Sequence, residues 1–246
     1  MEALRVENLS KNFGGVQAIR NVSFSVEAGQ RLGIIGPNGA GKTTLFNLLN
    51  GQLLPSAGRI YFFGREITTM ATHHRTRLGQ ARSFQISSLF FNLTVLKNIL
   101  LALHGTRPSG FQMFRAITAY KHQLTKAEEL LGAMDLWKKR DLLVKNLSHG
   151  EQRKMEIAFT LALEPKMLLL DEPSAGLTTV ESDDVIGIIH SQGADITVLI
   201  IAHDIDLIFS VADRIMVIHY GQIIAEGKPE EIQADLRVKE VYMGIE

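Results

Sequence analysis

The sequence contains no cysteine, so disulfide bonds, thiolate catalysis and cysteine-ligated metal centres are excluded. Neither sign of charge is in excess, because Lys+Arg and Asp+Glu each number 26. That balance argues against a dedicated nucleic-acid-binding protein, which usually carries a basic excess. Long apolar runs are also missing, since the longest, Met167–Leu170 and Thr197–Ala202, are far too short to span a bilayer. Residues 1–13 lack the apolar stretch of a signal peptide, so we expect any membrane contact to be peripheral and made through a partner.

The composition is ordinary for a globular protein, with 46% hydrophobic and 21% charged residues. Segments that predict strands alternate along the chain with segments that predict helices. Apolar and polar residues alternate over 2–8 and 20–27, which predicts half-buried strands in an N-terminal β region that we expect to be antiparallel. Later apolar runs are continuous, which favours an α/β fold with a largely parallel sheet covered on both faces. We predict further strands at 30–35, 59–63, 167–171, 196–202, 214–218 and 223–225, and helices at 43–50, 180–192, 204–212 and 229–234.

Residues 86–163 have a different character, because their apolar residues recur at helical spacing. We predict helices at 95–104, 123–137 and 151–163, the last of them stopped by Pro165. The sequence therefore predicts one domain over residues 1–246. Its α/β core would comprise residues 1–85 and 164–246, and residues 86–163 would form a helical subdomain.

The stretch Gly36–Thr43, GPNGAGKT, matches the phosphate-binding pattern G-x-x-x-x-G-K-[ST]. Its glycines let successive backbone N–H groups point at phosphate oxygens, and the helix that follows adds the positive end of its dipole. We expect Lys42 to reach the β- and γ-phosphates of ATP and the Thr43 hydroxyl to ligate Mg²⁺. The alternative is a glycine-rich turn with a chance lysine. The predicted nucleotide-binding residues here are Gly36, Asn38, Gly39, Ala40, Gly41, Lys42, Thr43 and Thr44.

Two acidic residues follow the apolar run Met167–Leu170. A buried strand at this place would deliver Asp171 to the Mg²⁺ shell, directly or through water. Glu172, one residue further on, could then polarise a water for attack on the γ-phosphate. An Asp-Glu pair is commonplace by itself, but behind a buried strand and a phosphate loop it predicts a catalytic pair.

A third polar element, NLSHGEQRK at 146–154, is similar to the signature motif LSGGQ of ATP-binding cassette (ABC) transporter ATPases. The motifs occur in that family's order, and the resemblance covers essentially the whole chain. It implies a P-loop NTPase core and two cassettes that dimerise head to tail, with Ser148 and the Gly150 N–H contacting the γ-phosphate of the partner's ATP. Ser148 and Glu151 also form a capping-box pattern, an alternative role that can coexist with the first. His149 replaces the first glycine of the family motif, and Glu151 stands in the usual place of glutamine.

Further positions match the family by resemblance alone. Phe13 matches the aromatic residue that stacks on adenine, although core packing is an alternative for it. Gln85 matches the glutamine that senses Mg²⁺ and the attacking water, and His203 matches the histidine that contacts the γ-phosphate. Thr178 stands where the family often has aspartate in the loop between cassettes. The resemblance implies catalytic roles for Glu172, His203 and Gln85, and metal ligation by Thr43, Gln85 and Asp171.

Two segments, FGGVQAI at 13–19 and VKEVYMG at 238–244, resemble the ATPases of branched-chain and hydrophobic amino acid uptake systems. The resemblance implies an ATPase, with ATP and Mg²⁺ as cofactors, that energises import from a peripheral position on the cytoplasmic face of the membrane. Implied partners are integral membrane permease subunits, a second cassette that is identical or paralogous, and indirectly a solute-binding protein. A membrane subunit would dock in the groove near Gln85, Phe90 and Phe91, although core packing within the helical subdomain is an equal alternative for the two phenylalanines. Rival functions are a non-transport cassette ATPase and a soluble P-loop kinase.

Overall fold

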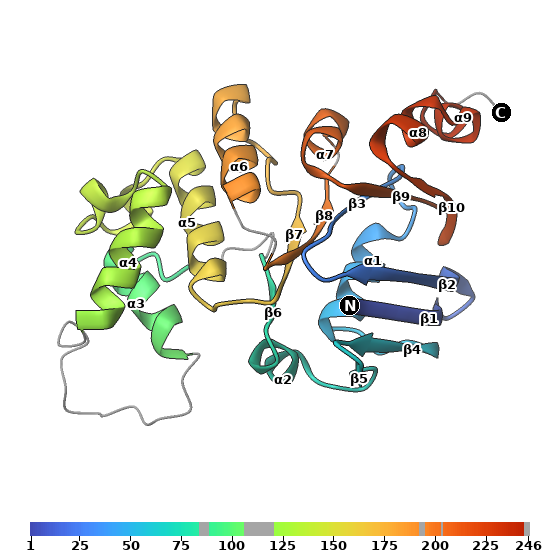
Figure 1. Ribbon diagram of the computed structural model, residues 1–246, viewed down its shortest axis with the longest axis horizontal. Helices are drawn as coiled ribbons and strands as arrows, with labels where there is room; N and C mark the ends of the chain where they lie inside the picture. The colour runs from blue at the N-terminus through green and yellow to red at the C-terminus, as the bar shows by residue number, and fades with distance from the viewer. Residues whose placement is uncertain (84–88, 106–120, 192–194, 203, 244–246) are drawn as a thin grey trace.

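The computed structural model describes residues 1–83, 89–105, 121–191, 195–202 and 204–243 and contains two β-sheets flanked by helices. The antiparallel sheet lies at one end of the molecule (Figure 1). At the other end lie α3 (Val95–Gly105), α4 (Lys121–Ala133) and α5 (His149–Leu161). The parallel-rich sheet lies between these two ends, so the structure confirms the predicted fold class.

The antiparallel sheet is built from β1 (Glu2–Phe13), β2 (Val16–Glu27), β4 (Ala57–Phe62) and β5 (Arg65–Glu66), in the order β2-β1-β4-β5. The first two strands pair down to the tight turn that separates them, so each is longer than the alternating pattern predicted. The strand β5 was not predicted, because two residues are too few to show a period. The N-terminal β region is antiparallel, as expected.

The second sheet has the strand order β10-β9-β3-β8-β7-β6, and within it the described strands run parallel except for the antiparallel pair β9 and β10. Every residue of β7 and β8 is buried, which is why their sequences are continuous apolar runs. The carboxyl ends of the neighbouring strands β3, β8 and β7 meet at one edge. The six strands are β3 (Arg31–Ile35), β6 (Gln80–Arg82), β7 (Met167–Asp171), β8 (Thr197–Ile201), β9 (Arg214–His219) and β10 (Gln222–Gly227).

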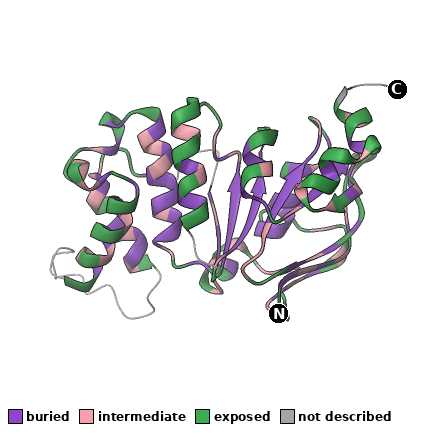
Figure 2. Cartoon of the chain, turned by 45° about the horizontal axis from the view of Figure 1, so that its top comes forward, coloured by how far each residue is buried: buried purple, intermediate pink, exposed green. Residues whose placement is uncertain are grey.

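Successive residues of the parallel strands enter different cores, as the two-residue period of a strand requires. Leu169 of β7 joins the cluster that fills the space between the two sheets, together with Phe46 of α1 (Lys42–Asn50). Its neighbour Leu168 joins a second cluster, which includes Ile157 of α5. Figure 2 shows the buried parallel strands and the exposed outer faces of the helices. The helices α3–α5 therefore share a core with the sheet, and the division into core and helical subdomain stays a prediction.

Several helices differ from their predicted bounds. The helix predicted at 123–137 ends at Ala133, and the chain continues through 3-10 turns at Trp137–Lys139 and Val144–Asn146. The helix predicted at 151–163 begins earlier, at His149, because Ser148 is its N-cap. The remaining helices are α2 (Thr72–Arg77), α6 (Thr179–Ser191), α7 (Ile205–Val211), α8 (Pro229–Ala234) and α9 (Leu236–Met243), of which α2 and α9 were not predicted.

The helix α2 is anchored by a charged residue instead of an apolar stripe. Arg75 is fully buried, and its guanidinium donates to the carbonyl oxygens of Leu48 at 2.9 Å and Leu49 at 2.6 Å, at the end of α1. It also donates to the carbonyl oxygens of Met70 at 2.8 Å and Thr68 at 3.1 Å. Burial lowers the pKa of Arg75 to about 10, so the side chain stays charged at neutral pH. Two of the last carbonyl groups of α1 are thereby hydrogen-bonded within the protein.

Candidate nucleotide site

The phosphate loop connects β3 to α1 and is shaped by the backbone that surrounds it. A Cβ atom at Gly36 would overlap the carbonyl oxygen of Ile218 in β9. At Gly41, where φ is +107°, a Cβ atom would lie 2.7 Å from the carbonyl oxygen of Ala18 in β2. These two neighbours are backbone atoms that cannot move aside, so the fold itself requires glycine at both ends of the loop. Between them, Asn38 and Gly39 form the exposed part of the loop, and Ala40 is buried.

Lys42 begins α1 and is only 6% exposed. Its Nζ donates to the carbonyl oxygens of Gly36 at 2.7 Å and Pro37 at 3.0 Å, so the ammonium group lies inside the loop. Burial lowers the pKa of Lys42, while the charges of Glu172 and Asp171 act in the opposite direction. The loop therefore holds a cation close to two carboxylates. Thr43 is exposed and Thr44 half-buried in the same helical turn.

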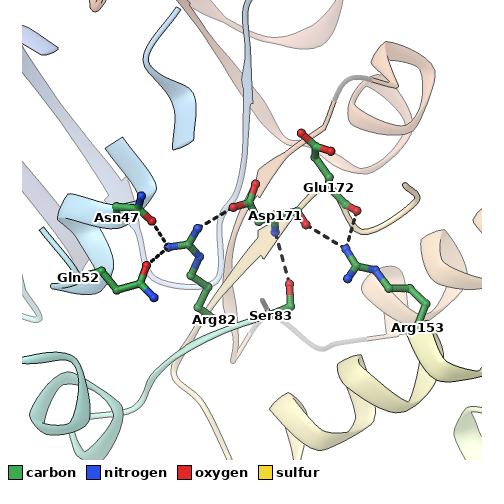
Figure 3. Close-up of polar contacts among 7 residues, drawn as sticks. All are labelled: Asn47, Gln52, Arg82, Ser83, Arg153, Asp171 and Glu172. Atoms are coloured by element: carbon green, nitrogen blue, oxygen red, sulfur yellow. Dashed lines mark hydrogen bonds and ion pairs between the residues drawn. The ribbon is translucent and has the colours of Figure 1, made fainter. Parts of the chain in front are cut away.

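Asp171 ends β7 and is 1% exposed. Its Oδ2 accepts a hydrogen bond from Arg82 at 2.6 Å, and its backbone N–H points to Ser83 Oγ at 3.4 Å (Figure 3). Its other carboxylate oxygen, Oδ1, is buried and has no hydrogen-bond partner among the described residues. A buried carboxylate oxygen left in this way fits a hard cation such as Mg²⁺, which prefers oxygen ligands.

Glu172 has an unusual backbone, with φ at +50°, in the left-handed region that residues with a side chain rarely adopt. Its N–H donates to the carbonyl oxygen of Ile201, at the end of β8, at 2.7 Å. The turn also depends on Arg153 of α5, which donates to the carbonyl oxygens of Asp171 at 2.9 Å and Glu172 at 2.5 Å (Figure 3). It also donates to the carbonyl oxygen of Pro173 at 2.9 Å. These bonds offset the conformational cost at Glu172. Arg153 was not predicted, because it stands in the polar run EQRK at 151–154, where a further charged side chain gives no signal.

The signature motif forms the N-terminus of α5. Ser148 Oγ accepts from the Glu151 N–H at 3.2 Å, and the Ser148 N–H donates to Glu151 Oε2 at 3.0 Å. The capping-box alternative is thereby confirmed. Although burial acts to raise the pKa of the Glu151 carboxyl, hydrogen bonds from Lys139 and Ser148 lower it below its usual value. Ser148 and His149 are exposed, whereas Gly150 is buried.

The segment after β7 contacts the signature motif within the same chain. Thr178 donates to Glu181 Oε2 from its N–H and from its Oγ1, each at 2.9 Å, at the start of α6. A Cβ atom at Gly150 would overlap the Glu181 carboxylate, and one at Gly176 would lie 3.2 Å from His149 Cε1. Thr178, which stands where the family often has aspartate, therefore orders the first turn of α6 beside the motif. A cleft of about 490 Å³ lies along this contact, lined by His149, Gln152, Arg153, Glu156, Glu172, Ala175 and Gly176.

Three aromatic residues expected at functional surfaces are exposed. Phe13, at the end of β1, is 46% exposed, and Lys11 Nζ lies 5.1 Å from the centre of its ring. Phe90 is 52% and Phe91 38% exposed. The core-packing alternative is therefore wrong for all three. Gln85 and His203 lie outside the described residues.

No helix in the described part of the chain combines the length and the apolarity that crossing a membrane would require. Comparison with known proteins gives a consistent result along the chain. The model of the ABC transporter family matches residues 19–175, and that of the branched-chain amino acid ATP-binding cassette transporter matches residues 222–246.

Three similar proteins illustrate the relationship. The chain is 37% identical to the high-affinity branched-chain amino acid transport ATP-binding protein BraF of Pseudomonas aeruginosa, over 98% of this chain and 97% of that protein. It is 35% identical to the lipopolysaccharide export system ATP-binding protein LptB of Haemophilus influenzae, over 99% and 98%. The crystal structure of the ADP conformation of MJ1267, an ATP-binding cassette of an ABC transporter, matches with a TM-score of 0.86 at 34% identity, over 99% of each chain.

The motifs, the fold and these comparisons agree over nearly the full length of the chain, and they confirm the ATPase cassette that the motifs predicted. The chain belongs to the ABC transporter family.

Proposed function

We propose that this chain binds and hydrolyses ATP as the energising subunit of a membrane importer for branched-chain or hydrophobic amino acids. The observation that carries the proposal is the convergence of Lys42 in the phosphate loop with Asp171 and Glu172 at the end of β7. The choice of cargo is supported by the match of residues 222–246 to the branched-chain model and by the similarity to BraF.

The phosphate loop and two oxygen ligands would hold the nucleotide. Backbone N–H groups of residues 38–43 and the start of α1 would bind the phosphate oxygens, with Lys42 on the β- and γ-phosphates. The Thr43 hydroxyl, Asp171 Oδ1 and Gln85 would hold Mg²⁺, which supplies neutralisation of the phosphate charge. Phe13, exposed at the end of β1, would stack on the adenine ring.

Hydrolysis would depend on Glu172, whose backbone is held by Arg153 and β8. Its carboxylate would orient a water for attack on the γ-phosphate and accept the proton that the water loses. Gln85 and His203 would complete the site beside the attacking water and the γ-phosphate.

A second cassette would complete the site from the other side of the nucleotide. The exposed Ser148 and the start of α5 would contact the γ-phosphate bound by the partner chain, with the Gly150 N–H as a further donor. The partner would be a second copy or a paralogue, and closing of the two chains would follow ATP binding. This arrangement explains why the capped end of α5 is exposed at the surface.

The membrane subunits would dock at the exposed Phe90 and Phe91. The Phe90 backbone is anchored, because the buried Asn98 side chain accepts from the Phe90 N–H at 2.9 Å and donates to the Phe90 carbonyl oxygen at 3.1 Å. The chain would thus lie peripherally on the cytoplasmic face of the membrane, with a solute-binding protein acting on the permease from the other side. No nucleic acid is expected in the assembly.

The ATP site is tested by nucleotide binding to purified chain. Lys42→Ala is expected to abolish binding of a fluorescent ATP analogue, because the loop loses its buried cation. Lys239→Ala, on the exposed face of α9, is the matched control and is expected to bind like the wild type. Equal binding by the two variants would rule out the proposed loop. A phosphorylated product with an added small-molecule acceptor would favour the kinase alternative instead.

The transport role is tested by co-purification of a tagged chain from detergent-solubilised membranes, with the partners identified by mass spectrometry. We expect polytopic membrane subunits and a second cassette, and reconstitution with them is expected to give ATP-driven uptake of leucine or valine. Recovery of lipopolysaccharide-export components would contradict the amino acid cargo and indicate a role in export, as in the relative LptB. Recovery of soluble or ribosomal proteins alone, with ATPase activity stimulated by nucleic acid, would support a non-transport cassette.

A further inference from the structure

Arg82, the last residue of β6, places its guanidinium between α1 and β7 (Figure 3). Nη2 donates to Asp171 Oδ2 at 2.6 Å. Nη1 donates to Asn47 Oδ1 at 2.6 Å and to Gln52 Oε1 at 2.9 Å. The side chain is only 6% exposed, and its charged end lies 5.7 Å from the centre of the Phe46 ring. The motifs of the sequence gave no reason to single out this arginine.

The contact with Arg82 divides the Asp171 carboxylate into two unlike oxygens. Oδ2 is engaged by the guanidinium, whereas Oδ1 is buried and has no hydrogen-bond partner in the described part of the chain. Burying a carboxylate this deeply is costly unless an opposite charge lies beside it. The arginine supplies that charge through a fixed donor geometry, and it leaves one oxygen for another ligand.

The same guanidinium also reaches the helix of the phosphate loop. Asn47 lies four residues after Thr43 on α1, so the two side chains share one face of the helix, a single turn apart. Arg82 therefore ties the helix that carries Thr43 to the strand end that carries Asp171. These are two of the residues that would hold Mg²⁺ in the proposed function.

We propose that Arg82 is a positioning residue for the magnesium ion of the ATP site. By holding Asp171 Oδ2 it directs Oδ1 toward the metal, and by holding Asn47 it sets the spacing between the two ligand-bearing elements. This inference rests on the proposed ATPase function. Partners that orient metal ligands in this way typically change metal affinity by about 10–100-fold when they are removed.

The test separates binding of Mg²⁺ from binding of the nucleotide. A fluorescent ATP analogue is titrated onto each variant in EDTA, and Mg²⁺ is then titrated at fixed analogue concentration. We expect Arg82→Gln to raise the half-saturating Mg²⁺ concentration about 10–100-fold, while affinity in EDTA changes by about 2-fold or less. Arg82→Lys is expected to fall between the wild type and Arg82→Gln, because one ammonium cannot reproduce the fork of bonds.

The control is Arg5→Gln, which removes an arginine paired with Glu7 on the exposed face of β1, far from the site. It is expected to leave the Mg²⁺ titration unchanged. Should Arg82→Gln fail to fold, the Arg82→Lys titration decides the question. An equal loss of affinity with and without Mg²⁺, or an unchanged or lower half-saturating Mg²⁺ concentration, would overturn the proposal. A wild-type chain that binds no nucleotide under either condition would instead contradict the proposed function.

Discussion

The phosphate loop and the signature motif both place glycine at the start of a helix, but the surroundings of those glycines differ. Gly36 and Gly41 face carbonyl oxygens of neighbouring strands, which cannot move without breaking the sheet. Gly150 faces the end of the flexible Glu181 side chain, which can swing away. The fold of the chain itself therefore requires glycine in the phosphate loop. For the signature motif, we expect the requirement for glycine to come mainly from the partner's nucleotide that would approach the exposed end of α5.

The largest expected effect is on stability, at the phosphate loop. Gly36→Ala is expected to reduce the free energy of unfolding by about 3 kcal/mol or more, because the methyl group overlaps the Ile218 carbonyl oxygen. Gly64→Ala is the matched control, since Gly64 also has a positive φ, at +76°, but a Cβ atom there would meet nothing within 4 Å. Urea denaturation of the two variants provides the measurement. Equal losses would mean that backbone strain, and not the close approach, decides the cost.

Ser148 is expected to have a smaller effect on stability and a separate effect on activity. Ser148→Ala removes the N-cap of α5 and is expected to cost about 1 kcal/mol of unfolding free energy. Ser148→Asp keeps a good N-cap but adds a negative charge where the partner's γ-phosphate would lie. We expect the aspartate variant to be as stable as the wild type and to bind ATP, yet to lose hydrolysis. Normal hydrolysis by that variant would speak against the signature contact.

Gly150→Ala is expected to cost less than about 1 kcal/mol, because Glu181 can rotate out of the way. Combining it with Glu181→Ala is expected to abolish the steric part of that cost, which a double-mutant cycle measures. The rate of ATP hydrolysis is expected to fall by more than the small loss of stability can explain. The reason is that the added methyl group projects near the proposed phosphate contact. If Gly150→Ala lost as much stability as Gly36→Ala, the fold would require glycine equally in the signature motif and in the phosphate loop, and the proposed difference would be wrong.

The smallest effect is a pH dependence at the capping box. The pKa of Glu151 is lowered in the folded chain from its ordinary value of 4.5, so its stabilising contribution is present above that value. The contribution is lost as the pH falls through the lower folded pKa. We therefore expect the wild type to exceed Glu151→Gln in stability near neutral pH and to lose that advantage in acid. Glu128→Gln, exposed on α4, serves as the control in the same denaturation series.

The sequence predicted those parts of the site in which a local pattern carries the chemistry. The glycines and Lys42 of the phosphate loop, the apolar run before Asp171 and the Ser148 capping box are all read from neighbouring residues. The start of α5 was placed two residues too late, because the cap was recognised but the helix was counted from its acidic residue. Short elements without a hydrophobic period, such as α2 and β6, gave no signal.

Three buried arginines could not be predicted, because their partners are distant in sequence or belong to the backbone. Arg82 bonds to residues 30, 35 and 89 positions away. Arg75 and Arg153 bond mostly to carbonyl oxygens, which every residue has, so no pattern of side chains reveals them. The sequence thus indicates which groups would act on the nucleotide, and the structure adds the cations that hold those groups in place.

The buried cation of Arg75 also has an electrostatic consequence for the helix α1. Since the helix lies between two sheets, little water screens its dipole, and its C-terminal end carries partial negative charge. The guanidinium at the Leu48 and Leu49 carbonyl oxygens neutralises that negative pole. The positive pole at the phosphate loop is not offset within the helix, because the first turn of α1 contains no acidic residue, so α1 attracts anions at that end.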